Sequence, residues 1–219
     1  MPEESIPEPP RPHPHPGLFL ALEGPDGGGK TTQAARLAQA LGEETLLVRE
    51  PGGTAAGERI RDLLKDGEVR LDPMAELLLF LAARAQLVSE VIRPAIEAGR
   101  DIVCDRFSDS SVAYQGDARG LGAERVEELC DLATGGLWPD LTLLLRIHPE
   151  VAADRMAAQG RAADRFEGEG MELQQRVAEG YEDVARRHPD RVSVVEASGE
   201  PDQVHAAVIA ALQAVGAVE

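Results

Sequence analysis

The sequence predicts an α/β domain built on a five-stranded parallel sheet that is flanked by helices. Five short apolar segments alternate with longer segments of helical composition, as successive β-α units require. Most of the apolar segments lack an alternation of polar and apolar residues, which is typical of parallel strands covered on both faces. With 219 residues, the chain is long enough for one such domain with a well-buried core.

The predicted elements follow one another in a regular order. The strands are expected at residues 18–22, 45–48, 101–104, 141–147 and 191–195. The helices are expected at residues 30–41, 55–64, 73–98, 124–134, 149–158, 173–188 and 201–215. The sequence contains no internal repeat and no linker between two compact units, so residues 18–219 are expected to form one domain.

The first 17 residues differ in composition from this domain. They contain seven prolines and no apolar stretch of the kind that a signal peptide needs. We expect residues 1–17 to be a disordered extension in which His13 and His15 are solvated rather than bound to a metal.

Charge and cysteine content narrow the class of protein. The formal net charge of −17 argues against broad nucleic-acid binding, which needs a basic face. No apolar run approaches the roughly 20 residues of a membrane span, so no membrane association is expected. Cys104 and Cys130 are the two cysteines of the chain, too few for a disulfide scaffold. Both are predicted to be core thiols, which favours a cytoplasmic location.

The most informative motif is a glycine-rich loop between the first predicted strand and the first predicted helix. Residues 24–31 read Gly-Pro-Asp-Gly-Gly-Gly-Lys-Thr and match the phosphate-binding pattern G-x-x-x-x-G-K-[ST]. Backbone N–H groups of such a loop wrap a phosphate chain at the positive end of the following helix. Lys30 can reach the β- and γ-phosphates, and the Thr31 hydroxyl can bind Mg²⁺. The residues predicted to bind a nucleoside triphosphate are Gly24, Asp26, Gly27, Gly28, Gly29, Lys30, Thr31 and Thr32.

Two arginines indicate a second anion site beside this loop. In open parallel sheets, ligands bind beyond the carboxyl ends of the strands. Arg49 follows the second predicted strand and Arg106 follows the third. Because a guanidinium group can bind a phosphate through two hydrogen bonds, the pair predicts a site for a phosphorylated acceptor.

The remaining chemistry of the sequence fits phosphoryl transfer between two anions. It shows no Ser-His-Asp or Cys-His constellation and no metal-binding cysteine pair. A phosphomonoester has a second pKa of about 6 and is mostly a dianion at pH 7, so it needs no strong general base. It needs cations that offset charge on the moving group. The polar segment 159–170 is therefore predicted to be a mobile lid that carries Arg161 and Arg165, with Arg155 on its flank.

Five motifs, taken in order, resemble those of one known family. The phosphate loop is followed by REPGGT at 49–54, FLAAR at 80–84, DRFSDSSVAYQG at 105–116 and DRFE at 164–167. From about residue 18 onwards, this order resembles the thymidylate (dTMP) kinases, in the bacterial form with basic residues in the lid rather than in the phosphate loop. The resemblance implies a P-loop NTPase fold of the nucleoside-monophosphate-kinase type with a short lid. It also implies that ATP, with Mg²⁺, phosphorylates dTMP to dTDP in dTTP biosynthesis.

The resemblance further implies roles for individual side chains around the acceptor. Asp26 would accept a hydrogen bond from the 3′-hydroxyl of the sugar, while Arg49 and Arg106 would hold the acceptor phosphate. Phe80 would stack on thymine, and Arg84, four residues later on the same helix face, would donate to a thymine oxygen.

Ser111 and Gln115 match positions that line the base pocket of the family. Tyr114 matches a tyrosine that leaves no room for a ribose 2′-hydroxyl and thereby selects deoxyribose by exclusion. Asp105 is expected to bind Mg²⁺ or to orient an arginine, and Glu167 to contact the acceptor or a metal-bound water. The residues expected to take part in the transfer itself are Lys30, Asp105, Arg106, Arg161 and Arg165.

Other readings of the sequence remain open at this point. The chain could be a kinase for another nucleoside monophosphate or for a deoxynucleoside. A nucleotide-gated binding module is a further alternative, but the guanine-reading pattern N/T-K-x-D is missing from the sequence.

The resemblance also bears on assembly and on the adenine. Members of the family that the chain resembles are usually homodimers, and the resemblance implies that the turn at 197–199 borders the adenine. Arg146 stands where the family often has an aspartate, and the sequence does not explain it.

Overall fold

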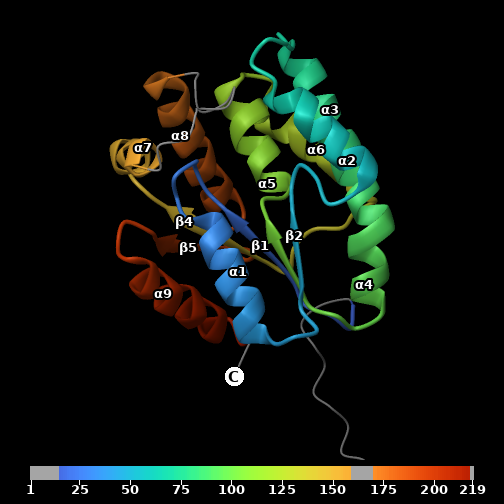
Figure 1. The fold of residues 1–219 in the computed structure, drawn as a ribbon, viewed down its shortest axis with the longest axis vertical. Helices are drawn as coiled ribbons and strands as arrows, with labels where there is room; N and C mark the ends of the chain where they lie inside the picture. Colours follow the sequence, from blue (N-terminus) through green and yellow to red (C-terminus); the bar gives the residue numbers. More distant parts are fainter. Residues whose placement is uncertain (1–14, 159–169, 218–219) are drawn as a thin grey trace, which may run out of the picture.

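A computed structural model describes residues 15–158 and 170–217 of the chain. In this part, five parallel strands form one sheet in the order β2-β3-β1-β4-β5, with helices on both faces (Figure 1). The strands are β1 (Phe19–Glu23), β2 (Leu46–Arg49), β3 (Ile102–Asp105), β4 (Leu141–Arg146) and β5 (Val192–Glu196). The helices are α1 (Lys30–Leu41), α2 (Ala55–Lys65), α3 (Pro73–Leu87), η1 (Val88–Ile92), α4 (Arg93–Glu97), α5 (Ser108–Ser111), η2 (Val112–Ala118), α6 (Ala123–Thr134), α7 (Pro149–Ala158), α8 (Met171–Arg187) and α9 (Pro201–Ala214).

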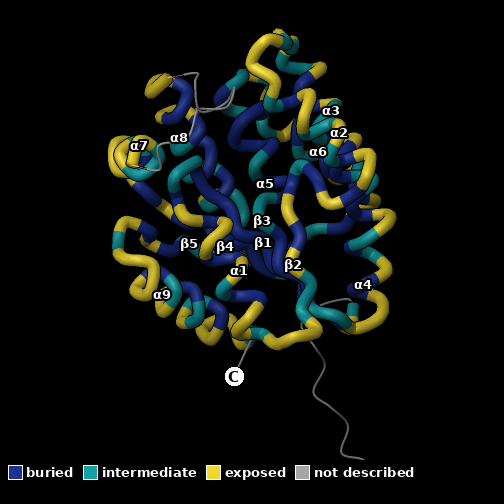
Figure 2. Tube along the Cα trace, in the orientation of Figure 1, coloured by how far each residue is buried: buried dark blue, intermediate teal, exposed yellow. Residues whose placement is uncertain are grey.

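The central strands β1, β3 and β4 are mostly buried, because their apolar side chains are covered on both faces of the sheet. On β1, Leu20 points to the face covered by α1 and α9 and packs in one cluster with Leu37 and Val208. Phe19, one residue earlier, points to the opposite face and packs with Leu87 at the end of α3. Successive residues of a strand alternate between faces, so a continuous apolar run is what a doubly covered strand requires. Figure 2 shows the result, with β1 buried at the centre, exposed residues on the edge strand β2 and further exposed residues on the outer sides of the helices.

The predicted α/β class and the five parallel strands are confirmed, with strand boundaries within a residue or two of the expected ones. The expected helix over residues 73–98 is a run of α3, η1 and α4, in which η1 is a π-helical segment. The sequence analysis missed one helical segment, α5 with η2, which follows β3 directly. Its Ser-Asp-Ser-Ser start is typical of a turn, and tertiary packing overrides that local preference.

Helix starts follow local chemistry where a capping side chain is present. Thr54 accepts a hydrogen bond from the N–H of Gly57 and begins α2, and Asp72 accepts one from Met74 and begins α3. Both bonds satisfy backbone donors that the first turn leaves without a partner in the helix.

The N-terminal extension is described only from residue 15 onwards. His15, which the sequence analysis expects to be solvated, is mostly buried: its Nε2 atom lies 3.6 Å from Asp140, and its Nδ1 atom is 2.6 Å from the carbonyl of Gly17. His13 lies outside the described residues. Among the described residues, none of the helices combines the length and the apolar character that crossing a bilayer requires.

The strand order brings the predicted functional segments to one edge of the sheet. Arg49 at the end of β2 is in register with Asp105 at the end of β3, and Asp105 is in register with Leu22 of β1. The phosphate loop therefore begins beside the ends of β2 and β3, as the sequence predicts.

Candidate active site

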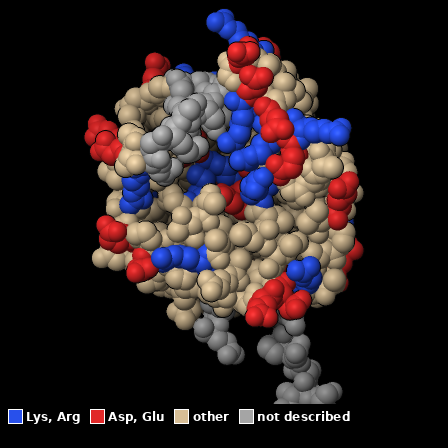
Figure 3. Space-filling view, viewed as in Figure 1, with Lys and Arg blue, Asp and Glu red and all other residues tan. Residues whose placement is uncertain are grey.

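A cavity of about 850 Å³ lies at the carboxyl ends of β1, β2 and β3. Most of the predicted site residues line it, together with residues from α2, α7 and the start of α9. Basic side chains gather in this hollow, although the chain as a whole carries a net charge of −17 (Figure 3). The basic residues of the cavity wall are Lys30, Arg49, Arg61, Lys65, Arg106 and Arg155. Such a concentration of positive charge suits a polyanionic ligand.

The phosphate loop is shaped by glycines that other residues cannot replace. Gly29 has a φ of 86° and precedes α1 without any side-chain cap, so the N–H groups of the first helical turn stay available to an anion. Gly27 has a φ of 80°, and a Cβ atom there would lie 2.4 Å from the carbonyl oxygen of Ala152. The loop can therefore follow this path only with glycine.

Lys30 lies within this loop with its charged group directed inward. Its Nζ atom donates to the carbonyl of Pro25 at 2.7 Å and lies 4.0 Å from Asp26. Burial, with the nearby positive charge of Arg106, lowers the pKa of Lys30 to about 8. A buried ammonium group at the N-terminus of α1 is well placed to bind phosphate oxygens.

Thr31 and Asp105, the two predicted metal ligands, are adjacent in the cavity. The Thr31 hydroxyl donates to Oδ2 of Asp105 at 2.6 Å. A hydroxyl and a carboxylate are the hard oxygen ligands that Mg²⁺ prefers, and this ion commonly completes its shell with waters and substrate phosphates. The described residues contain no group of three or more His, Cys, Asp or Glu side chains that could hold a metal alone. The pair therefore fits a Mg²⁺ ion held jointly by the protein and a nucleotide.

Arg106 and Asp26 form an ion pair at the centre of the cavity. Nη2 of Arg106 lies 2.6 Å from Oδ1 of Asp26, and the Tyr114 hydroxyl donates to Oδ2 of Asp26 at 3.0 Å. Burial alone would raise the pKa of Asp26, but Arg106 and then Lys30 hold it well below its usual range. The predicted phosphate-binding arginine and the predicted sugar-binding carboxylate are thus mutual partners in this structure.

Arg49, the second predicted phosphate-binding residue, also lines the cavity but is more exposed. Its Nη2 atom donates to Oε2 of Glu58 on α2 at 3.0 Å, and its side chain is 54 % exposed. An exposed ion pair of this kind contributes little to stability, so the guanidinium can exchange Glu58 for a ligand at small cost.

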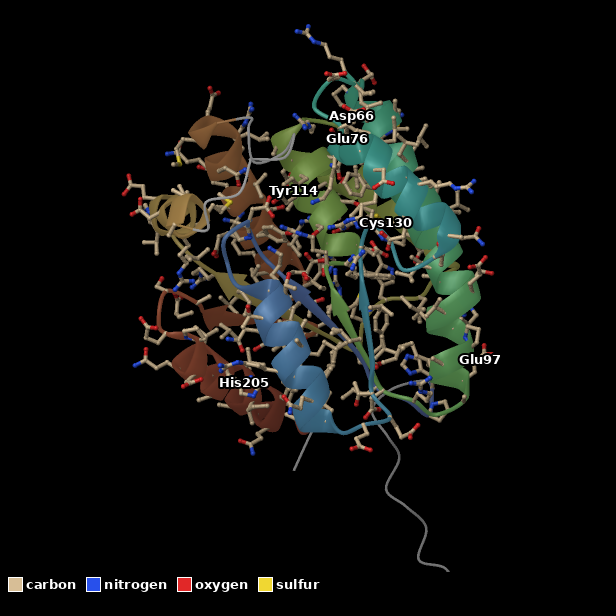
Figure 4. All side chains as sticks on the ribbon, viewed as in Figure 1. Asp66, Glu76, Glu97, Tyr114, Cys130 and His205 are labelled. Carbon is tan, nitrogen blue, oxygen red and sulfur yellow. The ribbon has the colours of Figure 1, made fainter. Side chains whose placement is uncertain are left out.

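The predicted base-binding side chains lie on two neighbouring helical segments. Phe80 comes from α3, whereas Ser111, Tyr114 and Gln115 come from α5 and η2, and all four line the cavity. The Ser111 hydroxyl is buried and, within the described part of the chain, has no hydrogen-bond partner. Gln115 donates to Glu76 at 2.8 Å, which orients its amide group. In Figure 4, Tyr114 lies above the ends of the strands, on the segment that follows β3.

Arg84 is the predicted base-binding residue that does not line the cavity. Its side chain is 1 % exposed, and its guanidinium donates to Glu50 at 2.8 Å and to the carbonyl of Phe107 at 3.0 Å. Phe80 and Arg84 are four residues apart on α3, and of the two only Phe80 lines the cavity. Glu50, the partner of the Arg84 guanidinium, does line the cavity.

Arg155 joins the helix before the lid segment to the turn after β5. It donates to the carbonyls of Ala197, Ser198 and Gly199 at 2.8, 3.0 and 2.8 Å. Arg155 and this turn both line the cavity, so the turn predicted to border the adenine is held in place by a guanidinium.

Three predicted site residues fall in the segment 159–169 and lie outside the described residues: Arg161, Arg165 and Glu167. Gly24 is described but does not line the cavity, and its carbonyl accepts a hydrogen bond from Arg106. Arg146, which the sequence leaves unexplained, donates to Glu182 on α8 and to Glu196 on β5 at the surface.

The sequence analysis missed several residues of the site. Arg61, Leu64 and Lys65 of α2 line the cavity, and the spacing of Arg61 and Lys65 by four residues on a predicted helix could have indicated a shared face. Glu23 and Tyr181 do not line the cavity, but the Tyr181 hydroxyl accepts from Arg106 and donates to Glu23. A lone carboxylate at the end of an apolar strand was a usable signal for Glu23, but no local pattern distinguishes Tyr181.

Comparison with known proteins agrees with this geometry. A family model described as thymidylate kinase matches residues 22–208 of the chain. A thymidylate kinase of Deinococcus radiodurans is 44 % identical over 199 residues, which are 90 % of this chain and 96 % of the relative. A thymidylate kinase of Synechococcus sp. (strain JA-2-3B'a(2-13)) is 48 % identical over 86 % of this chain and 91 % of its own length.

A solved structure is also similar. The crystal structure of thymidylate kinase from Ehrlichia chaffeensis superposes with a TM-score of 0.75 at 34 % identity, covering 90 % of this chain and 99 % of the other. Sequence and structure thus agree over nearly the whole chain. The chain belongs to the thymidylate kinase family.

Proposed function

We infer that the protein transfers the γ-phosphoryl group of ATP to dTMP, giving dTDP and ADP. One observation carries this inference: a single cavity joins a phosphate loop to a second group of cationic and base-pocket side chains. A cavity of about 850 Å³ lies within the range of ligand sites that enclose most of a bound molecule. The two substrates would meet head to head across Arg106, and membership of the family supports the identity of the acceptor.

The phosphate loop and α1 would hold ATP. The first-turn N–H groups and Lys30 would contact its phosphates, and the turn held by Arg155 would border its adenine. Thr31 and Asp105 would hold Mg²⁺, which when bound offsets charge on the phosphate oxygens.

Arg106 and Arg49 would hold the phosphate of dTMP, and Asp26 would accept from the sugar 3′-hydroxyl. When dTMP binds, Arg106 would lose part of its contact with Asp26 and would instead bind the phosphate dianion, which is a stronger partner for a guanidinium. Ser111, whose hydroxyl is buried and has no hydrogen-bond partner in the described part of the chain, would bind a polar atom of the base, and Phe80 would lie against the face of the base. Arg161, Arg165 and Glu167 remain proposed lid residues.

Two further properties are proposed. A homodimer is proposed because exposed leucines stand on α2, α3 and α6, namely Leu63, Leu78 and Leu132, and α3 packs against both of the other two helices. A reducing compartment such as the cytoplasm is proposed because Cys104 and Cys130 are both buried free thiols.

A coupled ADP-release assay with dTMP, dUMP, UMP and dGMP tests the proposed function. We expect turnover with ATP to be fastest for dTMP and slowest for UMP and dGMP. Equal rates with all four acceptors, or hydrolysis of ATP that no acceptor accelerates, would refute it.

A further inference from the structure

We propose that Glu23 is a positioning residue that fixes Arg106 for phosphoryl transfer, acting through the hydroxyl groups of Ser110 and Tyr181. This inference rests on the proposed function and assigns a role to a carboxylate that does not line the cavity. Glu23 ends β1 directly before the phosphate loop, and none of its surface is exposed.

The Glu23 carboxylate accepts from four donors. Its Oε1 atom accepts from the backbone N–H groups of Phe107 at 2.7 Å and Ser110 at 3.1 Å. Its Oε2 atom accepts from the Ser110 hydroxyl at 2.6 Å and the Tyr181 hydroxyl at 3.0 Å. Donors face both carboxylate oxygens, and only the ionised form accepts at both without directing an O–H of its own against one of these donors. The arrangement is therefore built around an ionised Glu23.

The two hydroxyl groups connect this carboxylate to Arg106. Nη1 of Arg106 donates to Ser110 Oγ at 3.0 Å and to Tyr181 Oη at 2.9 Å. Each hydroxyl thus donates a hydrogen bond to Glu23 and accepts a hydrogen bond from the guanidinium. Nη2 of Arg106 is left to face Asp26 and the cavity. Glu23 therefore sets which edge of the guanidinium reaches a bound phosphate.

Glu23 also holds the backbone on which Arg106 stands. Arg106 has a φ of 72°, and it is the one non-glycine residue with a positive φ among residues 15–158 and 170–217. Such a conformation persists only where the surroundings enforce it, and it occurs often at functional sites. Of the two N–H groups that Glu23 binds, that of Phe107 directly follows Arg106 in the chain and that of Ser110 lies four residues after it. One carboxylate thus restrains both the backbone and the side chain of Arg106.

The ionisation of Glu23 falls within a pH range where activity can be measured. Burial, followed by the negative charge of Asp109, raises the pKa of Glu23 to about 7, while Arg106 and the hydrogen bonds oppose the rise. The other titratable groups that interact with Glu23 come from α1, α3, β3 and α8: Lys30, Arg84, Cys104 and Tyr181.

The substitution Glu23→Gln tests the inference, since it keeps the shape but replaces one acceptor oxygen by a donor. We expect kcat for dTMP to fall about 10²-fold, as misplacement of a substrate-positioning group does, with little change in KM for ATP. In the wild type, kcat should rise as pH increases through about 7, and this rise should vanish in the variant. A purely structural role would not remove one limb of the pH profile.

A matched control is Asp140→Asn. Asp140 accepts from the N–H of Phe19 at 2.7 Å, at the opposite end of β1 and far from the cavity edge, and its substitution should leave kcat and the pH profile unchanged. Tyr181→Phe removes one of the bridging hydroxyls and keeps the ring, so kcat should fall in the same direction by a smaller factor. If Glu23→Gln does not fold, the kcat of Tyr181→Phe tests the inference in its place.

The possible outcomes separate this inference from the proposed function. A wild type that does not phosphorylate dTMP refutes the function. A wild type that does, together with a folded Glu23→Gln variant of equal kcat and pH profile, overturns the inference alone. An unchanged kcat in Tyr181→Phe overturns the part played by its hydroxyl.

Discussion

Nη2 of Arg106 lies 2.6 Å from Oδ1 of Asp26, which joins the predicted phosphate-binding residue to the predicted sugar-binding residue. The two residues are 80 positions apart in the chain. Because β1 and β3 are neighbours in the sheet, the loops that follow these strands meet, and the ion pair marks the point where they do. The proposed substrate would have to compete with this ion pair, so we expect substitutions of Arg106 and Asp26 to affect its binding.

Replacing Arg106 by alanine is expected to lower kcat for dTMP by about 10²- to 10³-fold, the usual effect of removing one preorganised electrostatic contact. Binding of ATP should change little, because the phosphate loop and α1 are intact. Steady-state kinetics and nucleotide titration measure the two effects. Arg146→Ala is the control: its ion pairs with Glu182 and Glu196 are at the surface, and activity should be unaffected. Unchanged turnover in Arg106→Ala would contradict the second anion site.

Replacing Tyr114 by alanine is expected to relax the selection against ribonucleotides. The centre of the Tyr114 ring lies 6.2 Å from that of the Tyr181 ring, and its hydroxyl donates to Asp26, so Tyr114 lies beside the proposed sugar-binding carboxylate. The ratio of kcat/KM for dUMP over UMP should fall in Tyr114→Ala and stay near the wild-type value in Tyr114→Phe. An unaltered ratio in the alanine variant would argue against steric exclusion.

The stability of the protein is expected to carry a pH dependence that originates in Glu23. The pKa of Glu23 is raised from 4.5 to about 7, so between these values the folded state binds more protons than the unfolded state. The contribution of Glu23 to stability is therefore fully present below about pH 4.5 and is lost as pH rises through about 7. Denaturant unfolding at pH 5 and pH 8 should show a smaller decrease for Glu23→Gln than for the wild type. Parallel pH curves for the two proteins would disprove this assignment.

Replacing Gly180 by alanine is expected to lower the free energy of unfolding by about 1–3 kcal/mol, as overpacking does. A Cβ atom at this position would lie 2.9 Å from the carbonyl oxygen of Ala113, so α8 and η2 could not approach as they do. This loss should outweigh the better helix propensity of alanine, which is worth about 1 kcal/mol. Gly67→Ala, where the added atom meets open space, should be close to neutral. Chemical denaturation of both variants measures the difference, and equal stabilities would refute close packing as the reason for Gly180.

Charge placed on the proposed dimer face is expected to separate the subunits. Leu78 and Leu132 are 53 % and 79 % exposed, and Leu78→Glu or Leu132→Glu would leave a charge to be buried in the interface. Sedimentation velocity should show a shift from dimer to monomer in both variants. Val215→Glu, at an exposed site near the end of α9, should not shift the equilibrium. A wild type that sediments as a monomer would refute the dimer itself.

Much of the fold and of the cavity could be predicted because the signals are local. Strand positions follow from short apolar runs, and helix α1 follows from the loop motif that precedes it. The helical segment over 108–118 could not be predicted in this way, since its start has the composition of a turn and its packing partners come from α6 and α8.

The sequence by itself determined the order of β-α units, the phosphate loop and the set of residues at the strand ends, because each depends on neighbours within a few positions. Only the tertiary structure decided the partners: Arg84 with Glu50, Arg106 with Asp26, and Glu23 with the turn after β3. These pairings span 34, 80 and 84 residues and depend on the strand order β2-β3-β1. Burial makes these pairings necessary, because a charged group removed from water is costly unless it has an oppositely charged or hydrogen-bonding partner. Which partner is available depends on the segments that the fold brings close to it.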